Sequence, residues 1–213
     1  MRTDDLVTML ATGAGDVEPS AARRRFALAI GWGALGASLL MAILLGVRDD
    51  LAHAAGLPMF WMKFGFVAAL AVASVVAALR LSQPGVALGG APLGMAAPLL
   101  AIWALAGAVL LAAEPADRAG LIFGQTWSTC PLNITVLSVP TWATSMWAMK
   151  GLAPTRLRLA GGVAGLLAGA VAAVVYTLHC PEMAAPFLAT WYVLGILIPA
   201  ILGALLGPRL LRW

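Results

Sequence analysis

Residues 26–47 read FALAIGWGALGASLLMAILLGV, a run without a charged side chain. An α-helix rises about 1.5 Å per residue, so this run is long enough to cross a hydrocarbon core of roughly 30 Å. Three arginines, Arg23–Arg25, come directly before the run, and Arg48 follows it. The run is therefore typical of a membrane-spanning helix, and it decides the class of the fold.

The rest of the chain repeats this pattern. Of its 213 residues, 62% are hydrophobic and 10% are charged, whereas a soluble domain carries about a quarter charged residues. We expect an all-α integral membrane protein, a bundle of six transmembrane helices preceded by a short cytoplasmic N-terminal helix. Residues 1–25 would form the tail and residues 26–213 the membrane domain. The spans are expected at about residues 26–47, 59–79, 93–113, 131–149, 159–178 and 184–206.

The distribution of charge predicts the orientation. Six crossings put both termini on the same side of the membrane, and that side would carry ten basic residues against three on the other. Basic residues are enriched in cytoplasmic loops, so we expect both termini to be cytoplasmic. The net charge of +4 is explained in this way, by the lipid bilayer, and does not indicate direct binding of nucleic acid.

Two of the expected helices carry patterns that predict contact with other helices. Ser138, Thr141 and Ser145 share one face of the fourth span, which we expect to look at protein and not at lipid. A stripe of small residues from Gly161 to Gly169 in the fifth span favours close packing, within one bundle or between two copies. The sequence therefore leaves open whether the protein forms a homo-oligomer.

The chain has two cysteines, and each precedes a proline: Cys130-Pro131 and Cys180-Pro181. Proline is favoured in the first turn of a helix, so each cysteine is expected to cap a helix at its outer end. A thiol at that position tends to be reactive, because the helix dipole favours the thiolate. On the expected topology both thiols face the oxidising periplasm of a bacterial inner membrane.

Three chemistries remain open for the cysteines. Two periplasmic cysteines commonly form a structural disulfide, and the same geometry also permits a redox-labile pair. The third is a soft-metal site for zinc or Cu(I), in which the metal would be a signal and not a resident cofactor. Its ligands would be Cys130, Cys180 and His179, with His53 or Met183 in addition. Lys63, by contrast, is expected to extend outward to the membrane interface.

The tail predicts a short amphipathic helix. Thr3 suits a helix N-cap, and Asp4 and Asp5 suit the positive end of a first turn. One helical face would be apolar, made of Leu6, Met9 and Leu10 with Val7 beside them.

No pattern typical of an enzyme is present. The sequence contains neither Cys-x-x-Cys nor His-Glu-x-x-His, and it has no nucleophile elbow. The expected spans carry almost no ionisable side chains, which transporters and pumps normally have. A small permease or channel and a thiol-redox membrane protein are the alternatives to a regulatory role.

One known family combines four features that this sequence also has. They are the opening segment, the arginines Arg23–Arg25 before the first span, the six spans and the paired Cys-Pro dipeptides. The segment reads Met1-Arg2-Thr3-Asp4-Asp5-Leu6, with Met9-Leu10-Ala11 after it. Over essentially its full length the chain resembles the NrsF family of membrane anti-sigma factors, which restrain an extracytoplasmic-function sigma factor.

The resemblance implies a function for each part of the chain. The tail would hold the sigma factor inactive at the bacterial inner membrane, with Asp4, Asp5, Leu6, Met9 and Leu10 as the binding residues. Cys130 and Cys180 match the two periplasmic cysteines of the family, which are linked to the sensing of heavy-metal or oxidative stress.

Overall fold

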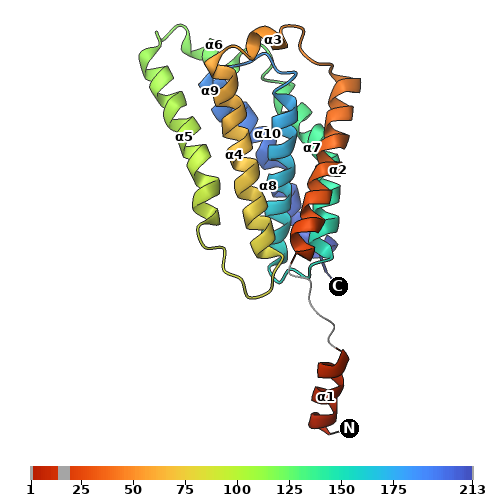
Figure 1. Ribbon diagram of the computed structural model, residues 1–213. Helices are drawn as coiled ribbons and strands as arrows, with labels where there is room; N and C mark the ends of the chain where they lie inside the picture. Colours follow the sequence, from red (N-terminus) through yellow and green to blue (C-terminus); the bar gives the residue numbers. More distant parts are fainter. Residues whose placement is uncertain (1, 14–19, 213) are drawn as a thin grey trace.

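The computed structural model describes residues 2–13 and 20–212. The regular structure in this part of the chain is helical, and the long helices lie side by side in one bundle (Figure 1). The bundle consists of α2 (Ala21–Leu44), α4 (Pro58–Leu81), α5 (Ala91–Ala112), α7 (Cys130–Lys150), α8 (Leu157–Tyr176) and a final run of α9 (Ala185–Phe187), the π-helical η1 (Leu188–Tyr192) and α10 (Val193–Leu210). The tail helix α1 (Thr3–Gly13) lies apart from it.

Five helices in the described residues are long and apolar enough to cross a membrane: α2, α4, α5, α8 and the run Ala185–Leu210. The chain is therefore a multi-pass membrane protein. α7 has a comparable 21 residues but carries more polar side chains. The start of α2 and the end of α10 lie at one end of the bundle, which we call the lower end after Figure 1.

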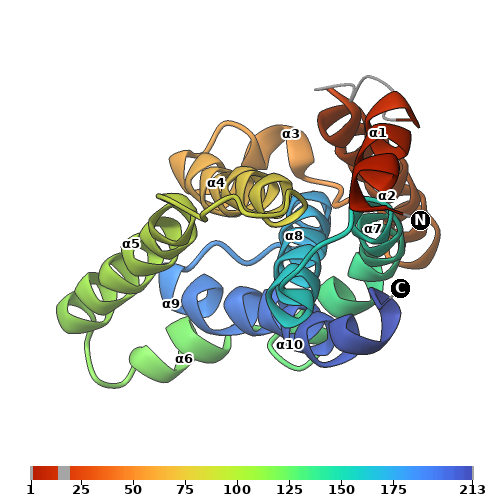
Figure 2. The same ribbon diagram turned by 90° about the horizontal axis from the view of Figure 1, so that it is seen from below.

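The central helix of the bundle is α8, which lies between α4, α7 and α10 (Figure 2). Its contact with α10 has no room for side chains. A Cβ atom added at Gly161 would overlap the carbonyl oxygen of Gly203, and one at Gly165 would overlap that of Pro199. The predicted close contact of the glycine stripe is confirmed, and the partner is α10 of the same bundle.

The polar face of α7 also turns inward, as predicted. Ser138, Thr141 and Ser145 are all buried. Thr144, on the neighbouring face, donates a hydrogen bond from Oγ1 to the carbonyl oxygen of Ala29 on α2 at 2.8 Å. This hydrogen bond joins α7 to α2, and the buried polar face of α7 points toward protein and not toward lipid.

Two connections that were expected to be loops contain short helices, α3 (Leu51–Ala54) and α6 (Arg118–Phe123). The final span widens into a π-helix at η1, where the regular ladder of backbone hydrogen bonds is interrupted. The indole Nε1 of Trp103 on α5 donates to the carbonyl oxygen of Ala189 at 2.9 Å. Side chains from neighbouring helices can thus supply donors to carbonyl groups in this segment.

The glycine contact generates a stability prediction. Gly203→Ala should lower the melting temperature of the detergent-solubilised protein, because the new methyl group meets the backbone of Gly161 and neither helix can move without repacking. Overpacking of this kind costs about 1–3 kcal/mol. The matched control is Gly107→Ala in α5, where nothing lies within 4 Å of an added Cβ. Equal melting temperatures for the two variants would contradict the packing described here.

Candidate functional site

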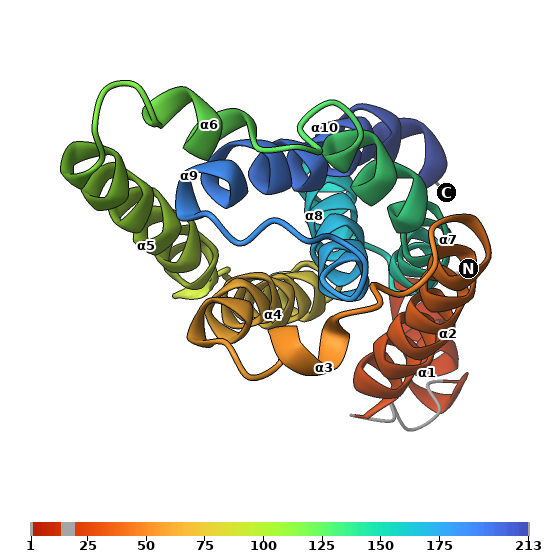
Figure 3. The same ribbon diagram turned by 90° about the horizontal axis from the view of Figure 1, so that it is seen from above.

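The connection between α8 and α9, residues 177–184, crosses the upper end of the bundle (Figure 3). We call this segment the strap. Cys180 lies within it, and its backbone N–H donates to the carbonyl oxygen of Tyr176 at 3.0 Å. The strap ends at Ala184, whose backbone is extended, and the next helix begins only at Ala185 with Pro186 in its first turn.

This geometry corrects one prediction. Cys180 does not cap a helix, because Pro181 disfavours a helical conformation for the residue before it and several residues separate it from α9. Cys130 does lie at a helix start, as the first residue of α7, directly before Pro131 in the first turn. The capping prediction is therefore wrong for Cys180, while Cys130 is close to its predicted place.

Folding brings the two cysteines together. Cys130 and Cys180 are both fully buried, belong to one apolar cluster and influence each other's ionisation. Both are free thiols, so the structural disulfide, one of the three chemistries left open by the sequence, is absent from the structure. The pair is covered by protein on all sides and is not open to solvent.

Sequence reasoning missed the residue that organises this site. Lys63 of α4 was expected to reach outward, but its side chain is fully buried and points under the strap. Its Nζ donates to the carbonyl oxygens of Cys180 and Glu182, both at 2.9 Å. It also lies 5.0 Å from the ring centroid of Tyr192, within range of a cation–π interaction.

A signal for this placement exists in the sequence. Positions 60, 63, 67, 70 and 74 follow helical spacing, and in the structure all five residues of that stripe are buried. A lysine on such an inward stripe cannot reach the interface. An ionisable residue inside a membrane protein is by default a candidate functional residue.

A second cation holds the same carbonyl group. Arg48, in the connection before α3, donates from Nη1 to the Cys180 carbonyl oxygen at 3.3 Å, and its backbone N–H donates to that of Leu178 at 3.1 Å. Asp50 pairs with the Arg48 guanidinium at 2.6 Å, and this contact raises the pKa of Arg48 and lowers that of Asp50. The strap is therefore bound both by Lys63 of α4 and by Arg48 of the connection between α2 and α3.

The carboxylate of Glu182 attaches the strap to the start of α7. Its Oε1 accepts hydrogen bonds from the backbone N–H groups of Gln125, at 2.6 Å, and Thr126, at 3.2 Å. The carbonyl oxygen of Thr126 in turn accepts the N–H of Cys130 at 2.9 Å. A short chain of hydrogen bonds thus connects the backbone on both sides of the cysteine pair.

The electrostatics of the site favour one thiolate. The neighbouring Cys130 thiol, as hydrogen-bond donor, and the Lys63 ammonium lower the pKa of Cys180 to about 5, against the effect of burial, which raises it. Cys180 is therefore the thiol of the pair that ionises more readily, with the Cys130 thiol as its hydrogen-bond donor.

The soft-metal site, the third chemistry left open by the sequence, is not assembled around His179. In the part of the chain that the structure describes, no three His, Cys, Asp or Glu side chains are grouped to hold a metal ion. The Nδ1 of His179 instead lies 2.9 Å from the carbonyl oxygen of Gly46, and its ring packs against Tyr176. His53 is an exposed residue of α3.

The tail residues singled out from sequence lie on a helix, as predicted. α1 begins at Thr3 and carries Asp4 and Asp5 in its first turn. Its large apolar side chains are exposed: Leu6, Val7, Met9 and Leu10. The tail thus presents an uncovered apolar face next to two carboxylates.

Comparisons with known proteins identify the family of the chain. The model of the NrsF family, described as negative regulator of sigma F, matches residues 10–213. The chain belongs to the NrsF family. It is 59% identical to the probable anti-sigma-F factor NrsF of Azospira oryzae over 213 residues, and 42% identical to the anti-sigma-F factor NrsF of Caulobacter vibrioides over 217 residues. Both alignments cover 100% of each chain.

NrsF proteins are negative regulators and not enzymes, which agrees with the prediction from the missing catalytic patterns. No solved structure matches the chain.

The buried lysine generates a prediction for this NrsF protein. Lys63→Met should leave the Glu182 carbonyl without its hydrogen-bond donor, which should lower the free energy of unfolding by about 1–3 kcal/mol. It should also raise the pKa of Cys180 above its value of about 5, because the nearby positive charge is removed. The infrared S–H stretching band at pH 7 should therefore be stronger in the variant than in the parent protein.

The exposed Lys150→Met serves as the control, and Cys180→Ser assigns the band. An unchanged S–H intensity in Lys63→Met would contradict the role given to the ammonium group.

Proposed function

We propose that this protein is an inner-membrane anti-sigma factor, which holds sigma F through residues 1–25 and releases it when the cysteine pair reacts. The observation that carries the proposal is the full-length match to two proteins named as anti-sigma-F factors. We expect the partner to be a sigma factor of the extracytoplasmic-function class. Neither part of the proposal needs a bound cofactor or contact with nucleic acid.

The exposed face of α1 supports the assignment of the tail. An amphipathic helix commonly binds a partner by laying its apolar side chains into a groove. Leu6, Met9 and Leu10 would fill such a groove on sigma F, with Asp4 and Asp5 facing basic residues at its edge. Nothing in the described structure covers these side chains.

Charge supports the orientation. We take α7 as a sixth span, because it is as long as its neighbours and packs among them. In the described bundle the lower end carries nine basic residues and no acidic one, whereas five acidic residues lie at the upper end. The lower end, with both termini, would then be cytoplasmic. A periplasmic location of a reporter enzyme fused to the C-terminus would contradict this.

The two free thiols in one cluster support a sensor of thiophilic stress. A two-electron oxidant would join the two sulfurs in a disulfide, and a soft metal ion would bind both. Either event would alter Cys180 beside Lys63 and so change the contacts of the strap. Since the strap connects α8 to the final span, a shift at the upper end would reach the lower end as rigid-body motion of helices.

The tail is tested by capture of sigma F. Leu6→Ala, Met9→Ala and Leu10→Ala combined should weaken co-purification of sigma F from membranes about tenfold or more, because three apolar anchors are lost. The combined control, Thr8→Ala and Thr12→Ala, alters the opposite face of the same helix and should retain capture. Equal capture by both variants would show that the apolar face of α1 is not part of the interface with sigma F.

The sensor is tested in cells. Cys130→Ser and Cys180→Ser should each abolish the rise in sigma F-dependent transcription caused by an oxidant or a soft metal ion, because one sulfur alone cannot form either product. Capture of sigma F without stress should persist in both variants. Normal induction in either one would exclude the cysteine pair as the sensor.

A further inference from the structure

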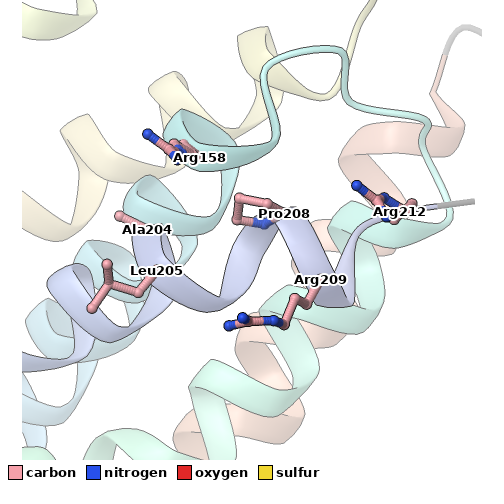
Figure 4. Close-up of a pocket in the computed structure, with 6 residues that line it drawn as sticks. All are labelled: Arg158, Ala204, Leu205, Pro208, Arg209 and Arg212. Atoms are coloured by element: carbon pink, nitrogen blue, oxygen red, sulfur yellow. The ribbon is translucent and has the colours of Figure 1, made fainter.

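Three arginines surround a pocket of about 630 Å³ at the lower end, between the start of α8 and the end of α10 (Figure 4). The pocket is lined by Arg158, Ala204, Leu205, Pro208, Arg209 and Arg212. Its wall is therefore cationic on the side of the membrane surface and apolar on the side of the bundle.

Among the described residues, no acidic side chain pairs with these guanidinium groups. The ion pair that the described residues form is Arg48 with Asp50, at the upper end of the bundle. Among the residues described, Arg158, Arg209 and Arg212 make neither an ion pair nor a side-chain hydrogen bond, and all three are exposed. Three like charges around one pocket favour an anionic ligand with several acceptor oxygens.

The apolar side of the pocket continues along α10. Leu197, Ile201 and Leu205 follow one another at helical spacing and are all exposed, and Arg209 comes one turn further. From Leu197 to Arg209 the helix rises roughly 18 Å, close to the depth of one leaflet of about 15 Å. A ligand with a long apolar part would lie against this stripe while its anionic part remains at the arginines.

We propose that this pocket binds an anionic phospholipid, phosphatidylglycerol or its diphosphatidyl form, through the phosphodiester headgroup. Arginine makes bidentate hydrogen bonds to phosphate oxygens, and basic pockets between transmembrane helices suit such headgroups. One acyl chain would run along the α10 stripe. The inference needs a membrane-embedded bundle but is independent of the binding of sigma F.

The test is native mass spectrometry of the full chain, released from nanodiscs that contain phosphatidylglycerol, cardiolipin or phosphatidylcholine. The parent protein should retain the two anionic lipids and not the zwitterionic one. The combined variant Arg158→Gln, Arg209→Gln and Arg212→Gln should retain them at least about tenfold less. The matched control is Arg24→Gln, Lys150→Gln and Arg156→Gln, which removes three exposed basic residues from the same end and should behave as the parent does.

Each remaining outcome would overturn the proposal. Equal loss in the two variants would mean general attraction to a basic surface, and equal retention would mean that the arginines are not the site. Displacement of the lipid by inorganic phosphate at millimolar concentration would assign the pocket to the free ion. Unchanged lipid retention together with loss of sigma F capture in the pocket variant would assign it to an acidic protein segment.

Discussion

The backbone contact between α8 and α10 constrains the rest of the bundle. Glycines on both helices let the main chains touch, so a side chain cannot be placed between them. The two helices are also joined by the strap, whose ends are therefore fixed in position. The strap has to cross the upper end of the bundle by a short path, and this path brings Cys180 over Lys63 and beside Cys130.

The buried charge and the break in the helical ladder depend on each other. An ammonium group inside a bundle is costly unless hydrogen bonds satisfy it. In a regular helix the carbonyl groups of Cys180 and Glu182 would be occupied, but Pro181 and Pro186 delay the next helix and leave both free. Lys63 accordingly finds two acceptors, and the non-helical strap finds a donor.

Much of the fold could be predicted from sequence, because its signals are local. Apolar runs located the helices, and the spacing of Gly161 and Gly165 and of Ser138 and Thr141 identified faces that pack. The helices against which these faces pack, by contrast, are not indicated by the local sequence. The four-residue glycine period did not say which helix it would meet, and the six-residue helix α6 is too short to show a periodicity of its own.

The site was predicted less completely for the same reason. The paired Cys-Pro dipeptides pointed to two residues that the fold does bring together, yet the free state of the thiols depends on what surrounds them. The acceptors that hold Lys63 inside the bundle lie more than a hundred residues away in sequence.

Complete burial of the two sulfurs has a kinetic consequence. A reagent can reach them only when the protein around them opens, and the rate of opening depends on the protein and not on the reagent. As the concentration of the reagent grows, the rate of modification should level off at the rate of opening. If the cysteine pair acts as the proposed sensor, it would respond to the duration of an exposure more than to its intensity.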